Sequence, residues 1–400
     1  MTDNLTRIPL RSYTDVDRYN DEIRKIVQGK TWHFIGFESQ IENPGDYSTT
    51  EIAEIPVVVL NDAGAIRAYV NRCVHRGSIL CLSEKGNINQ FECVYHGWTF
   101  DLKGNLNGVA FERGIKGQGG MPPDFNKEEY RLRELKVENF CGVLFATFDF
   151  DTPEIEKYLG PEIAAGVRRV LPSKPIVIGR TSQLIRSNWK IYVENNHDSY
   201  HASILHSFFT TFKLNRLTQS GGIVINEAGG SHISYSKRKQ EADDQVYDSE
   251  QLRANHDEFG LKDPGALRFI DELNDQISLQ ILTFFPLVVF HQISNSLCVR
   301  QVIPRGIDRV EIVWWYYGFS NDSDELKNAR LQQINLVGPA GYISMEDGAV
   351  GEFVQRNSPH SEGADGLIMM GGNGYESSAS RVTEAAIRGF WKQYYEMMDA

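Results

Sequence analysis

Cys73-Val-His75 and Cys93-Val-Tyr-His96 are the two stretches that decide the fold of this 400-residue chain. Each stretch offers one cysteine thiolate and one histidine imidazole within a few residues. Two cysteines and two histidines are the ligand set of a Rieske [2Fe–2S] centre, where the cysteines hold one iron and the histidines hold the other. A zinc knuckle prefers wider spacing, so Cys-x-His favours the iron–sulfur cluster over structural zinc.

A second set of metal-binding side chains lies in residues 188–206. Asp198, His201 and His206 offer one carboxylate and two imidazoles, the ligand set of a mononuclear non-haem Fe(II) site that activates O₂. Asp198 and His201 are three residues apart, so a helix over 190–206 would place them on one face. A chain with both centres can store an electron at the first and use it at the second.

The spacing leaves the ligands of this second site open. The carboxylate is either Asp198 or one from the distant Met345-Glu-Asp-Gly348 turn, and a His197/His201 pair at helical spacing rivals His201/His206. A helix with a solvated polar face and no metal would also explain the motif. The upstream Cys/His pairs favour the metal site.

Composition and charge narrow the class of protein. A length of 400 residues predicts two domains. The net charge of −12 excludes nucleic acid as a default partner and is compatible with a basic electron donor. Residues 1–11 contain no apolar signal segment, and the chain has no long uncharged apolar run, so we expect a cytoplasmic protein without membrane spans. Five cysteines do not suggest a disulfide framework.

The pattern of apolar residues predicts an α+β protein with two domains. Residues 1–160 should contain a small β-rich Rieske domain, and residues 161–400 a catalytic domain with a central antiparallel sheet covered by helices. Residues 237–255 are charged and weakly periodic, which indicates a surface loop. The expected strands of the second domain lie in 277–290, 296–303 and 310–319, and its main helices lie in 162–170, 190–206, 322–333 and 383–398.

These motifs resemble the large (α) subunits of the Rieske non-haem iron aromatic-ring-hydroxylating oxygenases. The resemblance covers essentially the whole chain, and it is closest to the terephthalate, salicylate and anthranilate oxygenases. The segments that carry it are Cys73–Gly77, Cys93–Trp98, Asn188–Lys190, Glu194-Asn195, Asp198–His206, Gly338–Gly341 and Glu346-Asp347, with Gly117–Pro122 and His206–Phe212 for the benzoate-type group.

The resemblance implies roles for particular residues. His201, His206 and Asp347 would hold the Fe(II), while Asp198 would bridge a cluster histidine of one subunit to an iron-ligating histidine of the next. His197 would then lie at the surface or behind the ligands. The family further implies a homotrimer of α subunits, a small β subunit in an α₃β₃ assembly, and electrons from NAD(P)H through a reductase or ferredoxin.

The expected substrate is an aromatic carboxylate such as salicylate, anthranilate or terephthalate, hydroxylated with O₂. A guanidinium suits a carboxylate through its planar fork of donors, and Arg300 and Arg381 are the candidates for this role. The alternatives are a Rieske O-demethylase or monooxygenase of another substrate, a non-catalytic Rieske electron carrier, and a zinc-stabilised binding protein.

Overall fold

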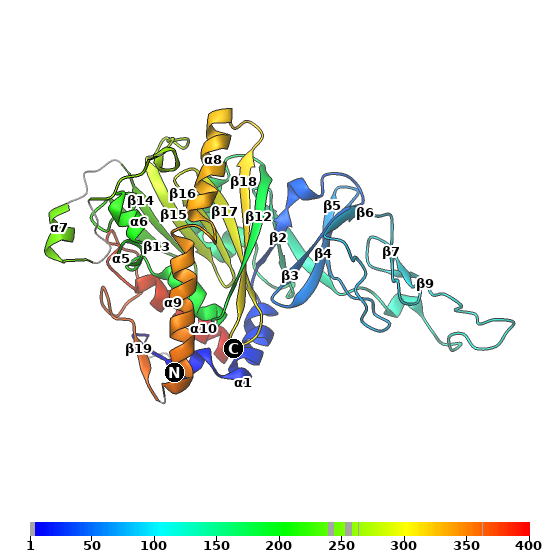
Figure 1. Ribbon diagram of the computed structural model, residues 1–400. Coiled ribbons are helices and arrows are strands. Elements are labelled where there is room, and N and C mark those ends of the chain that lie inside the picture. Colours follow the sequence, from blue (N-terminus) through cyan, green and yellow to red (C-terminus); the bar gives the residue numbers. More distant parts are fainter. Residues whose placement is uncertain (1–4, 239–243, 253–257, 263, 362) are drawn as a thin grey trace. The chain divides into compact units, whose positions relative to one another are not determined.

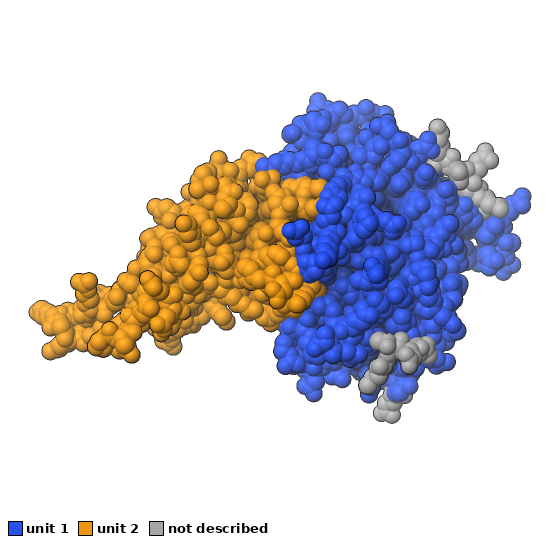
Figure 2. All heavy atoms as spheres, turned by 180° about the vertical axis from the view of Figure 1, so that it is seen from behind, with its two compact units in different colours: residues 1–27, 153–400 blue, residues 28–152 orange. Residues whose placement is uncertain are grey.

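The computed structural model describes residues 5–238, 244–252, 258–262, 264–361 and 363–400. The chain forms two compact units: residues 28–152, and residues 1–27 together with 153–400 (Figure 2). In the described part of the chain, no helix is long and apolar enough to cross a membrane. The predicted α+β class with an N-terminal β-rich part is confirmed (Figure 1).

The unit of residues 28–152 is built on antiparallel strands. Its main sheet has the order β2-β11-β10-β5-β4-β3-β6, and a small sheet of β7, β8 and β9 carries the second Cys/His stretch. The bounds are β2 His33–Phe37, β3 Asp46–Ile52, β4 Ile55–Asp62, β5 Ala65–Val70, β6 Lys85–Asn87, β7 Phe91–Glu92, β8 Thr99–Phe100, β9 Leu106–Gly108, β10 Glu134–Phe140 and β11 Val143–Thr147. The turn between β4 and β5 closes because the Asn61 side chain accepts a hydrogen bond from the amide of Gly64 (2.7 Å).

The other unit contains an antiparallel sheet of order β12-β18-β17-β16-β15-β14-β13 and a separate β1–β19 pair. Its strands are β1 Arg7–Pro9, β12 Pro175–Ile185, β13 Gly221–Ile225, β14 His232–Lys237, β15 Ile277–Phe284, β16 Val288–Ile293, β17 Ser296–Pro304, β18 Val310–Phe319 and β19 Asp365–Leu367. The helices are α1 Val16–Glu22, α2 Ile155–Leu159, α3 Pro161–Val170, α4 Trp189–His197, α5 Ala202–Leu205, α6 Ser207–Thr211, α7 Asp244–Ser249, α8 Asp324–Val337, α9 Ser344–Asn357 and α10 Ala385–Asp399.

The two faces of this sheet have different roles. Leu282 and its cross-strand partner Ile233 point toward α3. At Gly166 this helix lies so close to the sheet that a Cβ atom would be only 2.3 Å from Ile233 Cδ1. Successive side chains on a strand point to opposite faces, so Ile281 lies on the other face. There it lines a pocket together with residues that follow α4. The sheet therefore packs a helical layer on one side and shapes a site on the other.

The expected single helix over 190–206 is wrong. Helix α4 ends at His197, and Asp198 has an extended backbone with φ −89° and ψ 98°. Asp198 Oδ1 accepts hydrogen bonds from the amides of Tyr200 (2.8 Å) and His201 (3.2 Å). A carboxylate that caps backbone donors in this way favours a turn over a continuing helix.

Residues 5–27 pack with the C-terminal unit, whereas we expected residues 1–160 to form one domain with an N-terminal helical lead-in. Strand β1 pairs with β19, and Arg18 Nε donates to Tyr394 Oη on α10 (2.7 Å). The loop expected over 237–255 also differs. Residues 239–243 and 253–255 lie outside the described residues, while α7 is helical and buries Tyr247 against Ser203.

A buried ion pair connects the N-terminal segment to α4. Lys190 Nζ lies 2.7 Å from Glu22 Oε1, and both side chains are fully buried. Glu22 also accepts hydrogen bonds from Trp189 Nε1 (2.8 Å) and from the Tyr394 hydroxyl. Because every charge in this cluster has a partner, the pair fixes α1, α4 and α10 relative to one another.

Substituting Glu22→Gln should destabilise the chain by about 3–5 kcal/mol, because Lys190 is left as a buried charge without its counter-ion. The measurement is the midpoint of urea unfolding at unchanged m-value. Asp21→Asn is the matched control, since it breaks an exposed pair with Arg24 (2.6 Å) and should shift the midpoint little. Equal shifts for the two variants would contradict a stabilising role of the buried pair.

Candidate functional site

The two Cys/His stretches fold into loops with the same hydrogen bonds. The amide of Cys73 donates to the carbonyl five residues on (2.7 Å), and its carbonyl accepts from the amide of Gly77 (3.0 Å). The loop at Cys93 repeats both bonds at 2.9 Å, the second one from Gly97. Both glycines have positive φ, +76° and +62°, which a side chain would disfavour. The two loops can therefore present their sulfur atoms in equivalent ways.

The four side chains of these loops lie together. Cys73 and Cys93 are buried, and the rings of His75 and His96 are 4.5 Å apart. His96 Nδ1 is buried without a hydrogen-bond partner among the described residues. Trp98 is buried and stacks on His75 at 4.5 Å with an interplanar angle of 4°. Two buried thiols beside two imidazoles, one with an unpartnered nitrogen, fit a Rieske cluster.

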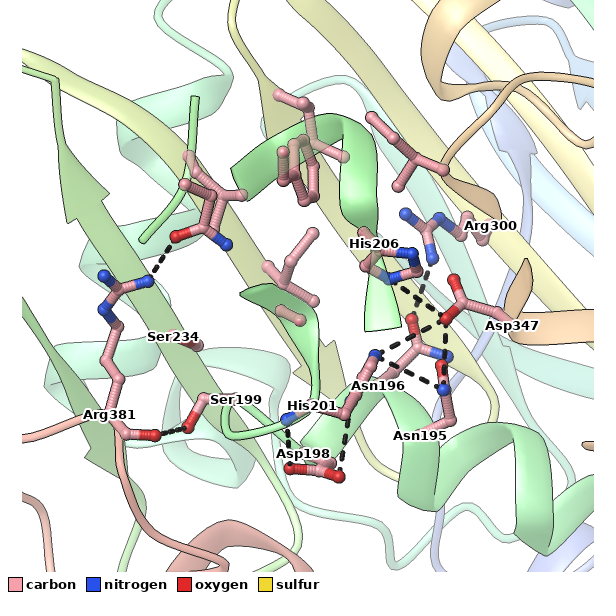
Figure 3. Close-up of a pocket in the computed structure, with 17 residues that line it drawn as sticks. Asn195, Asn196, Asp198, Ser199, His201, His206, Ser234, Arg300, Asp347 and Arg381 are labelled. Carbon is pink, nitrogen blue, oxygen red and sulfur yellow. Dashed lines mark hydrogen bonds and ion pairs between the residues drawn. The ribbon is translucent and has the colours of Figure 1, made fainter. Parts of the chain in front are cut away.

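A second cluster of ligand atoms lies in the unit formed by residues 1–27 and 153–400. His201 Nε2 is 3.4 Å and His206 Nε2 is 3.2 Å from Asp347 Oδ1 (Figure 3). One ligand atom from each of the three lies within 4.8 Å of the others. The arrangement is two imidazoles and one carboxylate, which fits a non-haem Fe(II) facial triad.

The other nitrogens of both histidines face carboxylates. His206 Nδ1 lies 2.9 Å from Glu346 Oε2, and His201 Nδ1 lies 3.3 Å from Asp198 Oδ2. Such partners orient an imidazole and increase its basicity as a metal ligand. Burial lowers the pKa of His201, but the carboxylates of Asp198 and Asp347 outweigh burial and raise it to about 10. The site is thus built to concentrate positive charge.

Asp347 remains ionised in this setting. Burial raises the pKa of its carboxyl, but His206 and His201 hold that pKa well below its usual range. Asn195 Nδ2 donates to Asp347 Oδ1 (3.1 Å) and fixes the carboxylate further. A buried carboxylate that stays charged is suited to bind a cation.

Several expected features differ in detail. Asp198 approaches His201 through the capping turn and not along a helix face. The expected turn at 345–348 is the first turn of α9, so Asp347 projects from a helix. Of the two places expected for His197, the surface is excluded: His197 is buried, stacks on His232 and hydrogen-bonds the carbonyls of Val193 and Gly230.

Arg300 and Arg381 line one pocket with this cluster. In the view of Figure 3, Arg300 lies on the side of Asp347 and Arg381 on the opposite side near Ser199. Phe209, Leu279, Ile281, Ile293 and Ile343 form an apolar wall, and polar side chains that include Ser199, Asn215 and Ser234 complete the lining. An apolar pocket with a few polar groups is suited to an aromatic ring.

Arg300 is buried, with 4% of its surface exposed. Its Nε donates to His291 Nδ1 (3.0 Å) and its Nη1 to Asn196 Oδ1 (2.8 Å). Its guanidinium also lies 4.3 Å from the centre of the Trp314 ring. No carboxylate of the described chain forms an ion pair with this cation, although the Asp347 carboxylate favours its charge from a distance.

Arg381 is similarly buried but more fully engaged. Its Nη1 donates to Asn215 Oδ1 and its Nη2 to the carbonyl of Arg216, while Nε is buried without a partner among the described residues. Burial lowers the pKa of Arg381 to about 10. Its hydrogen-bond acceptors are neutral, so this second guanidinium also lacks a counter-ion.

Sequence reasoning missed the contacts that hold these groups in place. Asn196 and His291 orient Arg300, and Glu346 orients His206. His291 is a histidine in the largely apolar strand β16, so the sequence did indicate a buried polar contact there. The sequence gives no local indication that Glu346 pairs with His206, because the two residues are 140 positions apart.

Replacing Glu346 with Gln should weaken iron binding about 10- to 100-fold, because His206 loses the carboxylate that orients it. Iron retained against a graded chelator series measures this loss, and the visible spectrum of the cluster should stay unchanged. Glu352→Gln, on the same helix α9, is the control. Equal iron retention in both variants would show that Glu346 does not support the site.

Family models match both parts of the chain that contain these clusters. The model of the Rieske [2Fe–2S] domain matches residues 31–117, and the model of the ring hydroxylating alpha subunit (catalytic domain) matches residues 167–400. The ligand clusters described above fall within these two ranges. The predicted cofactors, a [2Fe–2S] cluster and a mononuclear iron, are confirmed.

Curated relatives match along nearly the whole chain. The terminal oxygenase alpha 2 subunit of terephthalate 1,2-dioxygenase from Comamonas sp. is 48% identical over 98% of this chain and 95% of its own length. The anthranilate 1,2-dioxygenase large subunit of Burkholderia cepacia is 39% identical over 99% and 94%. The large oxygenase component of salicylate 5-hydroxylase from Ralstonia sp. is 35% identical over 98% and 94%.

A solved structure has the same fold. Naphthalene 1,2-dioxygenase from Rhodococcus sp., bound to indole, superimposes with a TM-score of 0.80 at 23% identity and covers 98% of this chain and 94% of its own. The fold and the resemblance inferred from the motifs are therefore confirmed.

Proposed function

The chain belongs to the ring-hydroxylating oxygenase α subunits that carry a Rieske domain, and we propose that it hydroxylates an aromatic carboxylate with O₂. The observation that carries the substrate class is the buried guanidinium of Arg300, which meets only neutral acceptors. A benzoate-type carboxylate would supply the missing negative charge. Names of the relatives support this class, since they act on terephthalate, anthranilate and salicylate.

The proposed cofactor ligands follow from the donor sets. Cys73, His75, Cys93 and His96 would hold the cluster, and His201, His206 and Asp347 would hold the iron. When bound, Fe(II) in such a triad activates O₂, and the cluster supplies electrons. The protein's own part is to hold the imidazoles, to place the ring against the apolar wall and to keep Asp347 charged.

Asp198 is proposed as the bridge between subunits. One of its oxygens faces His201, and a fifth of its side chain remains exposed. A cluster histidine of a neighbouring copy could hydrogen-bond this carboxylate, which implies a homotrimer of α subunits. We further propose that a small β subunit completes an α₃β₃ assembly and that a reductase or ferredoxin delivers electrons from NAD(P)H.

Arg300 would bind the carboxylate of the substrate. A guanidinium presents parallel N–H donors that match a carboxylate, and in a desolvated pocket this charge-assisted pairing is strong. His291 accepts from Nε, and Asn196 and the Tyr192 hydroxyl (3.4 Å) accept from Nη1, while Nη2 makes no hydrogen bond within the described chain. The open Nη2 edge is therefore available to a ligand.

Arg381 distinguishes two substrate types. Two uncompensated cations on opposite sides of the pocket favour a dicarboxylate, in which a ring carries an acid group toward each. The alternative is a monocarboxylate, favoured by the fact that both terminal nitrogens of Arg381 already donate within the protein. We propose the dicarboxylate, because the internal bonds of Arg381 leave its charge unpaired.

The test is an anaerobic single turnover of iron-replete, chemically reduced protein. O₂ is added with terephthalate, benzoate, anthranilate, salicylate or 2-halobenzoate, and products are identified by mass. A hydroxylated product with matching cluster oxidation supports the function, and a preference for terephthalate supports the dicarboxylate. Cluster oxidation without any product would contradict the carboxylate proposal. His201→Ala should keep the cluster spectrum and abolish product, whereas a pure electron carrier would be unaffected.

Substituting Arg300→Met should lower kcat/KM for the aromatic acid about 10²-fold, since losing one partner of a buried charge pair costs ~3 kcal/mol. Arg300→Lys keeps the charge but loses the fork and should lose less. Steady-state kinetics with each acid, together with iron and cluster content, measure the effect. An unchanged KM and kcat for Arg300→Met would show that the carboxylate is bound elsewhere.

A further inference from the structure

A basic groove lies beside the cluster ligands in the unit of residues 28–152. It has a volume of about 340 Å³ and is lined by residues 72–77 with Val70, Arg131 and Arg133. Four of the lining residues, Arg72, Arg76, Arg131 and Arg133, are arginines with exposed side chains. His75, one of the proposed cluster ligands, lines the same groove. A partner that fills the groove would therefore lie beside a proposed cluster ligand.

The four arginines carry unneutralised charge. Arg76 Nη1 donates to the Tyr95 hydroxyl (3.0 Å) and Arg131 Nη2 to a backbone carbonyl (3.2 Å). Arg133 Nη1 donates to Gln28 Oε1 (3.1 Å). No carboxylate within the described ranges forms an ion pair with any of the four, although carboxylates outnumber basic residues in the chain, 53 to 41. The positive charge is therefore concentrated at the cluster against the overall sign of the protein.

Local charge decides which partner can approach the cluster. The Debye length at physiological ionic strength is about 8 Å, so a partner in the groove experiences the arginines more strongly than distant acidic residues. Electrostatic steering of this kind raises association rates by about 10- to 1,000-fold. The net charge of −12 suggested a basic electron donor, but the arginines of the groove favour an acidic one.

We propose that this groove docks the electron donor through carboxylates on the donor's surface, beside His75. The inference rests on the proposed function, in which the cluster receives electrons from a separate protein. The donor gives one electron to the cluster at each encounter and leaves oxidised. An acidic face on a neighbouring copy of this chain would be a different occupant of the groove, and the experiment separates the two.

The experiment compares wild type with the double variant Arg72→Glu/Arg131→Glu. Stopped-flow absorbance follows reduction of the oxidised cluster by a reduced acidic [2Fe–2S] ferredoxin at several salt concentrations. Two small reductants with the same redox core serve as charge probes: reduced methyl viologen, a cation, and its sulfonatopropyl analogue, an anion. Lys85→Glu is the matched control, because Lys85 is exposed in the same unit and does not line the groove.

The expected result is about a tenfold loss in the rate of reduction by the ferredoxin at low salt, with a flatter salt dependence. The anionic viologen should lose its advantage over the cationic one in the double variant but not in Lys85→Glu. Single-turnover product from chemically reduced double variant should equal that of wild type, since this assay bypasses the donor. An intact visible cluster spectrum confirms folding.

Two outcomes would overturn the proposal. Unchanged reduction by the ferredoxin in the double variant would show that the donor docks elsewhere. Normal reduction with loss of single-turnover product would assign the groove to contact between copies of this chain. Cluster reduction needs no aromatic substrate, so a failure of the carboxylate proposal would leave this test intact.

Discussion

The anchoring of α4 against α9 is the constraint on which the metal site depends. Asn188 begins α4 by accepting a hydrogen bond from the amide of Lys190 (3.0 Å), and its own amide donates to Gln355 on α9 (2.8 Å). The chain that leaves α4 supplies both histidines, and α9 supplies Asp347. Gly348 lets α9 approach the sheet, because a Cβ there would lie 2.8 Å from Gln183 Nε2. A shift between these helices would separate the histidines from their carboxylate.

The pocket combines two opposite charge environments. Asp198, Glu346 and Asp347 surround His201 and His206 and create a site for a cation. The sheet and the segment before α10 add the guanidinium groups of Arg300 and Arg381 to the same pocket, and neither forms an ion pair with a carboxylate of the described chain. Burying charges without counter-ions is unfavourable, so such groups persist where a ligand completes them. In the proposed function, the metal binds at the carboxylates and the acid group of the substrate binds at a guanidinium of the same cavity.

Features set within a few residues could be predicted from the sequence, but contacts between residues far apart in the chain could not. The loops at Cys73 and Cys93 were predictable because ligand type and spacing are set within a few residues. The strands from Ile277 onward followed from their apolar, β-branched composition. The end of α4 at His197 was missed because Asp198 caps the next turn, a competition that helical spacing does not reveal. The packing of residues 1–27 with the C-terminal unit depends on Glu22, whose partners are more than 160 residues away.

Arg300 shows how a neutral scaffold can tune a charged residue. Burial and the neighbouring guanidinium of Arg300 hold the pKa of His291 well below its usual range, so the imidazole stays neutral. Only a neutral imidazole can accept the hydrogen bond from Arg300 Nε at Nδ1, and the ring proton of His291 is therefore on Nε2. Asn196 and Trp314 are likewise uncharged. The scaffold thus orients the guanidinium without neutralising it, and an aromatic acid gains a pairing that a neutral ring cannot. Under the proposed function, selectivity for acids would arise from the guanidinium charge that forms no ion pair within the protein.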